Sequence, residues 1–381
     1  MKNRGGSSIQ QPSGYKAFIP TNLPPNPFLK VEGALLQKLS RASLLLARLD
    51  GLAYTLPNHE LFLSMYAKKE ALLSAQIEGT EATFDNVLEF ESGVSVANSQ
   101  DVAEVVSYIK ALHYGIERLK TVPLSVRLIK ELHAIILSPE RDVHKTPGEF
   151  RRSQNWIGSA GATLNNAAFV PPPADVAMRA MSELEKYMHS KSLLPELIDC
   201  ALVHYQFETI HPFLDGNGRV GRLLITFFLY AKGVAERPLL YLSYYFKQNR
   251  QEYYDRLRMV STTGDYEQWV NFFLDAVIAT SEIAIATTKK ILLLQEEDKK
   301  KLYDRESSIS VLKLLDQFFV TPIMTSQMVA EKLQVTAPTA NRFLAKLVEL
   351  NILQEITGQK RDKRYRYARY IDILSEGAEP F

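Results

Sequence analysis

Residues 211–222 read HPFLDGNGRVGR and lie between two segments whose apolar residues recur at helical spacing. Gly216 and Gly218 have no side chains, so their backbone N–H groups can approach an anion closely, and a helix that opens beside them directs its positive end to the same place. Arg219 and Arg222 lie three positions apart and therefore share one helical face. The stretch predicts a phosphate-binding turn that leads into a helix.

Two further residues of this stretch bring catalytic chemistry. Asp215 offers a hard oxygen ligand that suits Mg²⁺, an ion that takes one or two carboxylates and lets substrate phosphates supply the other ligands. His211 is the only nearby side chain that titrates near neutral pH, so it is the candidate base. The Lys-Ser/Thr ending of the common phosphate loop is missing. A plain turn with a helix cap would explain any two of these features, but the whole combination favours a nucleotide site.

The stretch resembles the signature of the Fic family, H-P-F-x-[DE]-G-N-G-R-x-x-R, at every specified position. The resemblance implies a mainly α-helical Fic-fold core and a nucleotidyltransferase, a protein adenylyltransferase that moves AMP from ATP to a Tyr, Ser or Thr hydroxyl of a target protein or of itself. It also implies that His211 is the base and that Asp215 holds Mg²⁺. The residues that it assigns to the nucleotide phosphates are Gly216, Asn217, Gly218, Arg219, Gly221 and Arg222.

Two details refine this resemblance. The related Doc branch, which transfers the terminal phosphate, carries Lys where Gly218 stands here, so Gly218 favours nucleotidyl transfer. Asn249 follows an aromatic run at residues 241–246 that resembles the family segment beside the adenine pocket. Asn249 is therefore a candidate for nucleotide contact, although core packing explains the aromatic run equally well.

A second segment, residues 74–79, ends a helical run and resembles the inhibitory pattern of the family, [ST]-x-x-x-E-[GN]. The resemblance implies that Ser74, Glu78 and Gly79 are inhibitory residues, with Glu78 pairing with Arg222 in the space that the γ-phosphate needs. Because the segment precedes the catalytic stretch, the chain is similar to the class with an N-terminal inhibitory helix. From the residues alone, a helix that simply ends at a glycine is the alternative.

Residues 150–173 predict a β-hairpin in an otherwise helical chain, because two short extended segments flank a turn of small residues. A plain surface loop is the alternative. In the Fic family a similarly placed hairpin, the flap, pairs with the backbone of the target. The resemblance implies a flap whose docking residues are Asn155, Trp156, Ile157, Phe169 and Val170.

The C-terminal residues predict a winged helix-turn-helix, with helical patterns at 311–319, 325–333 and 338–350 followed by two short strands. Its basic edge suits contacts with duplex DNA. The candidate DNA contacts are Thr339, Asn341, Arg342, Lys360, Arg361, Lys363 and Arg364. A winged helix used only for protein contact fits the same pattern. The second candidate function is therefore a DNA-binding transcriptional regulator whose Fic core senses a nucleotide.

The patterns divide the chain into five segments. These are an extended or poorly ordered segment at 1–27, a helical region with the inhibitory helix at 28–122, the Fic catalytic core at 123–285, a helical connector at 286–304 and the winged helix domain at 305–381. Strands are expected only at the flap and near the C-terminus.

Composition limits the class of protein. The 381 residues have a net charge of +2 and a single cysteine, Cys200, which excludes an intramolecular disulfide and favours the reducing cytoplasm. The sequence has no apolar run that suggests a membrane span and no signal peptide.

We interpret His204 as a core histidine and His133 as an ordinary surface or interface residue. A homodimer is an open expectation, since Fic cores and winged helices often form one.

Overall fold

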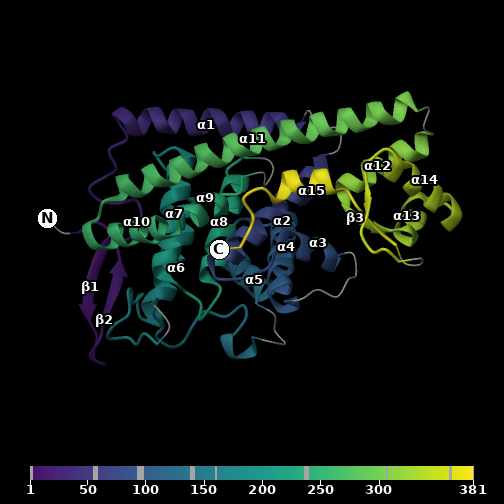
Figure 1. Ribbon diagram of the computed structural model, residues 1–381. Helices are drawn as coiled ribbons and strands as arrows, with labels where there is room; N and C mark the ends of the chain where they lie inside the picture. Colours follow the sequence, from purple (N-terminus) through teal and green to yellow (C-terminus); the bar gives the residue numbers. More distant parts are fainter. Residues whose placement is uncertain are drawn as a thin grey trace. The chain divides into compact units, whose positions relative to one another are not determined.

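The computed structural model describes residues 3–54, 59–91, 98–137, 142–158, 161–235, 240–305, 308–359 and 363–380 (Figure 1). The chain is mainly helical, with small antiparallel sheets. It forms two compact units, and each unit joins segments that lie far apart in the sequence. Unit 1 consists of Met1–Asp50 and Val106–Ser281, and unit 2 consists of Gly51–Val105 and Glu282–Phe381.

Unit 1 contains the catalytic stretch. Its strands are β1 (Gly6–Gln10) and β2 (Lys16–Pro20). Its helices are α5 (Val126–Ile136), the 3₁₀ turn η1 (Val143–Lys145), α6 (Ala174–His189), α7 (Glu196–Ile210), α8 (Asn217–Ala231), α9 (Ser243–Gln248) and α10 (Arg250–Thr263). Three helices run from one unit into the other, namely α1 (Gly33–Tyr54), α4 (Ser99–Leu119) and α11 (Tyr266–Asp304).

The core of unit 1 is built around α7, which packs against α8 (Figure 1). Almost every residue of α7 is buried, and a helix that is apolar on all sides belongs in a core. His204 of α7 lies among the rings of Phe246, Tyr253 and Trp269, at centroid distances of 6.0, 6.0 and 5.9 Å. Its Nε2 is 2.8 Å from the Tyr253 hydroxyl. The prediction of a core histidine is confirmed.

The N-terminal segment differs from the prediction. β1 and β2 pair antiparallel from Gly6↔Pro20 to Gln10↔Lys16, so the expectation of strands only at the flap and the C-terminus is wrong. The turn between them contains Gly14 at φ +90°, a conformation that glycine adopts readily. On β2, Ala17 and Phe18 are buried and anchor the hairpin. The Gly, Ser and Pro residues of this segment predicted an extended or poorly ordered chain, whereas residues 16–20 form a short strand.

Unit 2 combines an early helical pair with the C-terminal elements. The pair is α2 (His59–Ile77) and α3 (Phe84–Glu91). The C-terminal helices are α12 (Ile309–Val320), α13 (Ser326–Leu333), α14 (Ala337–Glu349) and α15 (Ala368–Ser375), and the strands are β3 (Ile323–Thr325), β4 (Gln354–Glu355) and β5 (Arg364–Arg366). The strands form one antiparallel sheet in the order β3-β5-β4. The helices α12, α13 and α14 lie close to the three predicted C-terminal helical patterns, whereas β3 and α15 were not predicted.

The predicted connector at 286–304 is not a separate helix, because α11 runs without a break from Tyr266 to Asp304. Within the described residues, α11 is the one helix that is long and apolar enough to cross a membrane by composition. In its most apolar window, 61% is buried inside the structure. Such burial is typical of a core helix.

Candidate active site

The turn between α7 and α8 places His211 at the end of one helix and before the start of the next. His211 has left-handed backbone angles, φ 49° and ψ 60°, and its N–H donates to the carbonyl of Phe207. Residues other than glycine rarely adopt this conformation, and those that do concentrate at functional sites. The ring Nδ1 lies 3.3 Å from the carbonyl oxygen of Glu208. Because a carbonyl only accepts, this contact assigns the proton of the neutral ring to Nδ1.

The side chain of Asn217 holds the loop in shape. Its Oδ1 accepts from the N–H of Phe213 at 2.8 Å, and its Nδ2 donates to the carbonyl of the same residue at 2.9 Å. The amide of Asn155 donates to that carbonyl as well, at 2.9 Å. Asn217 is only 2% exposed. The side-chain amide of Asn217 therefore holds the fold of the loop.

The N-terminus of α8 opens directly after the loop. Gly216 precedes it with φ +73° and ψ 4°, angles that favour glycine. The first bond of the helix runs from the N–H of Val220 to the carbonyl of Gly216 at 3.0 Å. The N–H groups of residues 217–219 precede this bond and have no carbonyl within the helix to pair with. Such N–H groups, with the helix dipole, form a general binding site for anions.

Two arginines follow on the first turns of α8. Arg219 and Arg222 are 5% and 2% exposed, so both guanidinium groups lie within the protein. Between them, a Cβ added at Gly221 would lie 2.1 Å from Oε1 of Glu208. The carbonyl of Gly221 also contacts Nδ1 of His204 at 2.9 Å. Gly221 therefore lies where α8 closely approaches Phe207 and Glu208 of α7.

Asp215 is the carboxylate of the loop, and it pairs with a lysine. Its Oδ1 accepts from the N–H of Gly216 at 2.6 Å. Its Oδ2 lies 2.7 Å from Nζ of Lys145, which also pairs with Oδ1 of Asp142 at 3.0 Å. Burial raises the pKa of Asp215, but the hydrogen bond from Lys145 and the charge of Arg219 outweigh burial and lower it. The side chain of Asp215 is 43% exposed, so a cation from solution can reach it.

The described part of the chain contains no group of three or more His, Cys, Asp or Glu side chains that could hold a metal. A metal held by Asp215 would take its other ligands from water and from substrate phosphates. That is the usual way in which Mg²⁺ binds, and the ammonium group beside Asp215 marks a position that already suits a cation.

His133 supports the loop from α5, which corrects the prediction of an ordinary surface or interface residue. It is fully buried, and its ring stacks on Phe213 with centroids 3.7 Å apart. Nδ1 accepts from the N–H of Gly148 at 2.8 Å, so Nε2 donates to the carbonyl of Asp215 at 3.0 Å. Burial lowers its pKa to about 4. The signal that could have revealed this role is position 133 in the apolar stripe of α5 with residues 129 and 136.

Arg151 is a second supporting residue that the sequence did not reveal. It is 1% exposed, its Nε donates to the carbonyl of His211 at 2.9 Å, and its backbone N–H donates to the carbonyl of Pro212 at 2.9 Å. Its guanidinium also donates to the carbonyl of Pro172. Burial lowers its pKa to about 10, so it stays charged at neutral pH. Arg151 thus fixes the backbone at His211 and Pro212.

Asn249 lies outside the loop, at the junction of α9 and α10. Its Nδ2 donates to the carbonyl of Tyr245 at 2.9 Å, and its own carbonyl accepts from the N–H of Tyr253 at 2.8 Å. The aromatic run before it is largely core, since Tyr241 and Phe246 are buried. Asn249 therefore joins α9 and α10.

The flap segment contains one pair of β-type hydrogen bonds among its described residues. The N–H of Ile157 donates to the carbonyl of Phe169 at 2.8 Å, and the reverse bond is 3.0 Å long. Trp156 and Ile157 are 43% and 36% exposed. The N–H of Phe18 on β2 donates to the carbonyl of Val170 at 2.9 Å. The backbone of the N-terminal hairpin is therefore hydrogen-bonded to the backbone of the flap segment.

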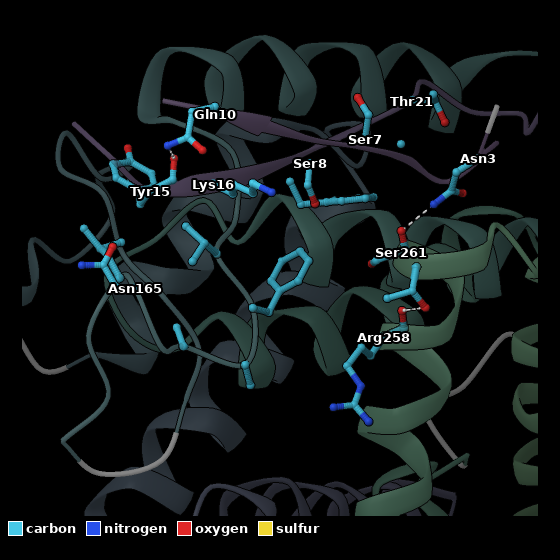
Figure 2. Close-up of a pocket in the computed structure, with 18 of the residues that line it drawn as sticks. Asn3, Ser7, Ser8, Gln10, Tyr15, Lys16, Thr21, Asn165, Arg258 and Ser261 are labelled. Carbon is cyan, nitrogen blue, oxygen red and sulfur yellow. Dashed lines mark hydrogen bonds between the residues drawn. The ribbon is translucent and has the colours of Figure 1, made fainter. Parts of the chain in front are cut away.

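A cavity of about 1150 Å³ opens beside the flap, between the N-terminal hairpin, residues 164–170 and α10. Figure 2 shows Lys16, Asn165 and Arg258 among the side chains that surround it. No residue of 211–222 lines this cavity, so it is separate from the loop.

The proposed inhibitory residues lie at the end of α2 in unit 2. Ser74 is buried, whereas Glu78 and Gly79 are exposed. The backbone of Gly79 has φ +103°, and its N–H donates to the carbonyl of Gln76 at 3.1 Å. The helix therefore ends at a glycine, as either interpretation of the motif requires.

The candidate DNA contacts lie in the C-terminal part of unit 2. On α14, Asn341 and Arg342 are exposed and Thr339 is half-buried. Lys363 and Arg364, at the start of β5, are half-buried. The remaining two candidates, Lys360 and Arg361, lie outside the described residues.

Comparison with known proteins identifies two family regions. Residues 36–117 match the family described as "Fic/DOC family N-terminal", and residues 123–229 match "Fic/DOC family". The chain is 30% identical over 251 residues to "Protein adenylyltransferase Fic" of Drosophila melanogaster. The matched region covers 61% of this chain and 46% of that protein. The protein of the same name in Drosophila virilis is 31% identical over 253 residues, covering 61% and 47%. The chain thus spans about half the length of these curated relatives.

Solved structures share the fold. A Fic family protein from Desulfovibrio desulfuricans G20 superposes with a TM-score of 0.59 at 19% identity, covering 89% of this chain and 97% of that one. Fic-1 (aa134–508) from C. elegans superposes with a TM-score of 0.51 at 20% identity, covering 67% and 72%.

Proposed function

We propose that this chain, which belongs to the Fic family and carries both its N-terminal region and its Fic domain, is a protein adenylyltransferase. It moves AMP from ATP to a Tyr, Ser or Thr hydroxyl of a target protein or of itself. One observation carries the proposal. A single turn carries the imidazole of His211, the carboxylate of Asp215 and the N-terminus of a helix that bears two buried arginines.

The chemistry follows from these groups. Nε2 of His211 takes the proton of the acceptor hydroxyl, whose oxygen then forms a bond to the α-phosphorus. The bond from the α-phosphorus to the bridging oxygen breaks, and pyrophosphate leaves with that electron pair. The first N–H groups of α8, with Arg219 and Arg222, bind the phosphates and stabilise the charge that develops. In-line displacement at phosphorus requires such positioning more than covalent help from the protein.

The residues present fit a Mg²⁺ ion. Asp215 would hold it, because its carboxylate is ionised, partly exposed and already beside an ammonium group. When bound, the ion would neutralise phosphate charge. His211 remains the group that accepts the proton, since it is the base whose ring geometry this loop fixes.

Inhibition by Glu78 is part of the proposal. The exposed carboxylate at the end of α2 would pair with Arg222 and so compete with the γ-phosphate for the same guanidinium. Ser74 and Gly79 would shape the end of the helix that presents Glu78.

The flap would bring the acceptor to the base. The exposed side chains of Trp156 and Ile157, and the backbone that bridges to Phe169, favour an extended target segment that binds by strand addition. Such recognition depends on backbone pairing and on few specific side chains.

The position of the label in ATP tests the reaction. Label at the α-phosphate should enter protein, whereas label at the γ-phosphate should not. His211→Ala should abolish incorporation, because it removes the group that accepts the proton of the hydroxyl. His189→Ala, at the exposed end of α6, is the matched control and should keep full activity. Incorporation of the γ-label would instead mean a kinase, and incorporation of neither label would contradict both transferase reactions.

A second candidate function rests on the C-terminal elements. We propose residues 305–381 as a winged helix domain, because α12–α14 precede a sheet of order β3-β5-β4 and the exposed face of α14 carries Asn341 and Arg342. A DNA-binding regulator that uses its Fic core as a nucleotide sensor would require duplex DNA to bind the full chain. A protein partner or a second copy of the chain is the alternative use of this domain.

A further inference from the structure

We propose that Lys145 is a counter-ion of Asp215. When nucleotide binds, a divalent cation takes the place of Lys145 at Asp215, and Lys145 remains paired with Asp142. The proposal rests on the proposed function of Asp215 as the metal ligand. It adds a residue from a different segment of unit 1 to the cation site, and it makes Lys145 a positioning residue rather than a group that touches the reacting atoms.

The geometry places one ammonium group between two carboxylates. Nζ of Lys145 lies 2.7 Å from Oδ2 of Asp215 and 3.0 Å from Oδ1 of Asp142. Lys145 ends the 3₁₀ turn η1, and its backbone N–H donates to the carbonyl of Asp142 at 2.7 Å. The turn therefore keeps Asp142 beside Lys145 whether or not Lys145 contacts Asp215.

The two oxygens of Asp215 have different partners. Oδ1 accepts from the N–H of Gly216 at 2.6 Å, a contact that the loop backbone fixes. Oδ2 faces Lys145, whose side chain is 32% exposed and can move. A metal ion that approaches Asp215 must therefore compete with Lys145 for Oδ2, while the contact with Gly216 keeps the carboxylate oriented.

The charges favour an exchange of one cation for another. Burial lowers the pKa of Lys145, but its hydrogen bonds to Asp215 and Asp142 outweigh burial and raise it. The pKa of Asp215 is lowered in spite of burial, through Lys145, Arg219 and Gly216. Both groups are thus ionised at neutral pH. Because Asp142 remains as a partner, Lys145 loses one hydrogen bond on release and does not become an unpaired charge.

Two substitutions should shift metal dependence in opposite directions. Lys145→Met removes the competing cation, so the Mg²⁺ concentration that gives half-maximal ATP binding should fall roughly threefold to fivefold, the range expected for a partly exposed ion pair. Asp142→Asn removes the alternative partner and leaves Lys145 on Asp215, so the same concentration should rise by a similar factor. A merely structural role of this cluster would move both midpoints the same way.

The experiment is a calorimetric titration of ATP into the full chain at stepped Mg²⁺ concentrations, in a His211→Ala background that prevents turnover. Lys145→Arg keeps the charge and should stay close to the parent, and Lys145→Gln is a second neutral variant if Lys145→Met does not fold. Shifts in the same direction, or midpoints equal to that of the parent, would overturn the role of Lys145. A parent protein whose ATP binding does not depend on Mg²⁺ would overturn the proposed metal site itself.

Discussion

His133 and His204 make the stability of unit 1 depend on pH. Burial lowers their pKa values from 6.5 to about 4 and about 3, so the unfolded chain binds protons first as the pH falls. Their contribution to the free energy of unfolding is complete above about pH 6.5 and is lost as the pH falls toward these lower values. For His133 the loss should approach roughly 3 kcal/mol near pH 4, since one pKa unit corresponds to about 1.4 kcal/mol.

Urea denaturation followed by tryptophan fluorescence measures this effect, because Trp156 and Trp269 both lie in unit 1. His133→Gln should be less stable at pH 7, because it loses the ring stacked on Phe213, and its stability should change less between pH 6.5 and pH 4. A variant with the pH dependence of the parent would show that folding does not lower the pKa of His133.

The sequence indicated the residues of the loop but not the residues that hold it. Consecutive residues such as 211–222 carry their chemistry in a local pattern. His133 lies 82 positions before Asp215, and only the packing of α5 against α8 brings them together. The contacts of Arg151 and Lys145 also depend on tertiary proximity, which residue spacing does not encode.

The end of α2 is the element on which inhibition depends. If Glu78 competes for Arg222, Glu78→Gly should raise incorporation of the α-label roughly 10-fold to 100-fold, the factor that corresponds to a charged hydrogen bond of about 1.5 to 3 kcal/mol. Glu81→Gly, a neighbouring exposed carboxylate, is the matched control and should behave as the parent. Equal activity of Glu78→Gly and the parent would remove Glu78 from regulation.

Elements with long apolar periodicity were easier to predict than short ones. The helices α12 (Ile309–Val320) and α14 (Ala337–Glu349) lie close to the predicted patterns at 311–319 and 338–350. The β1–β2 hairpin was missed because strands of five residues in a Gly- and Pro-rich segment carry little periodic signal. The length of α11 was missed because the rise in charge near residue 286 resembles a boundary, although the backbone continues as a helix.

The whole chain is organised by contacts that no local pattern contains. Lys69 and Gln76 of α2 donate to the carbonyls of Glu376 and Ala378 at 2.8 and 3.0 Å, and Tyr66 donates to the carbonyl of Ala284 at 3.0 Å. These bonds join residues more than 200 positions apart. Unit 2 is discontinuous for this reason, and the segment that ends in Glu78 belongs to the same unit as the C-terminal helices.

Because the C-terminal helices share a unit with residues 51–105, DNA binding should be measured with the full chain. If α14 enters the major groove, the full chain should bind a short DNA duplex at low salt, and its affinity should fall steeply between about 50 and 200 mM salt as counterions are released. Lys363→Ala should reduce the slope of log affinity against log salt by about 1, as expected for one lost phosphate contact. Asn341→Ala should weaken binding to some sequences more than others, because amide side chains read base edges.

Fluorescence anisotropy of a labelled duplex measures these affinities. Arg179→Ala, which removes an exposed arginine on α6 of unit 1, is the matched control for net charge and should leave the slope unchanged. A full chain that does not bind duplex at low salt would contradict the DNA-binding function. Equal slopes for Lys363→Ala, Arg179→Ala and the parent would place DNA on another surface. Either result would favour a protein partner for the C-terminal elements, since the exposed face of α14 would still be available for one.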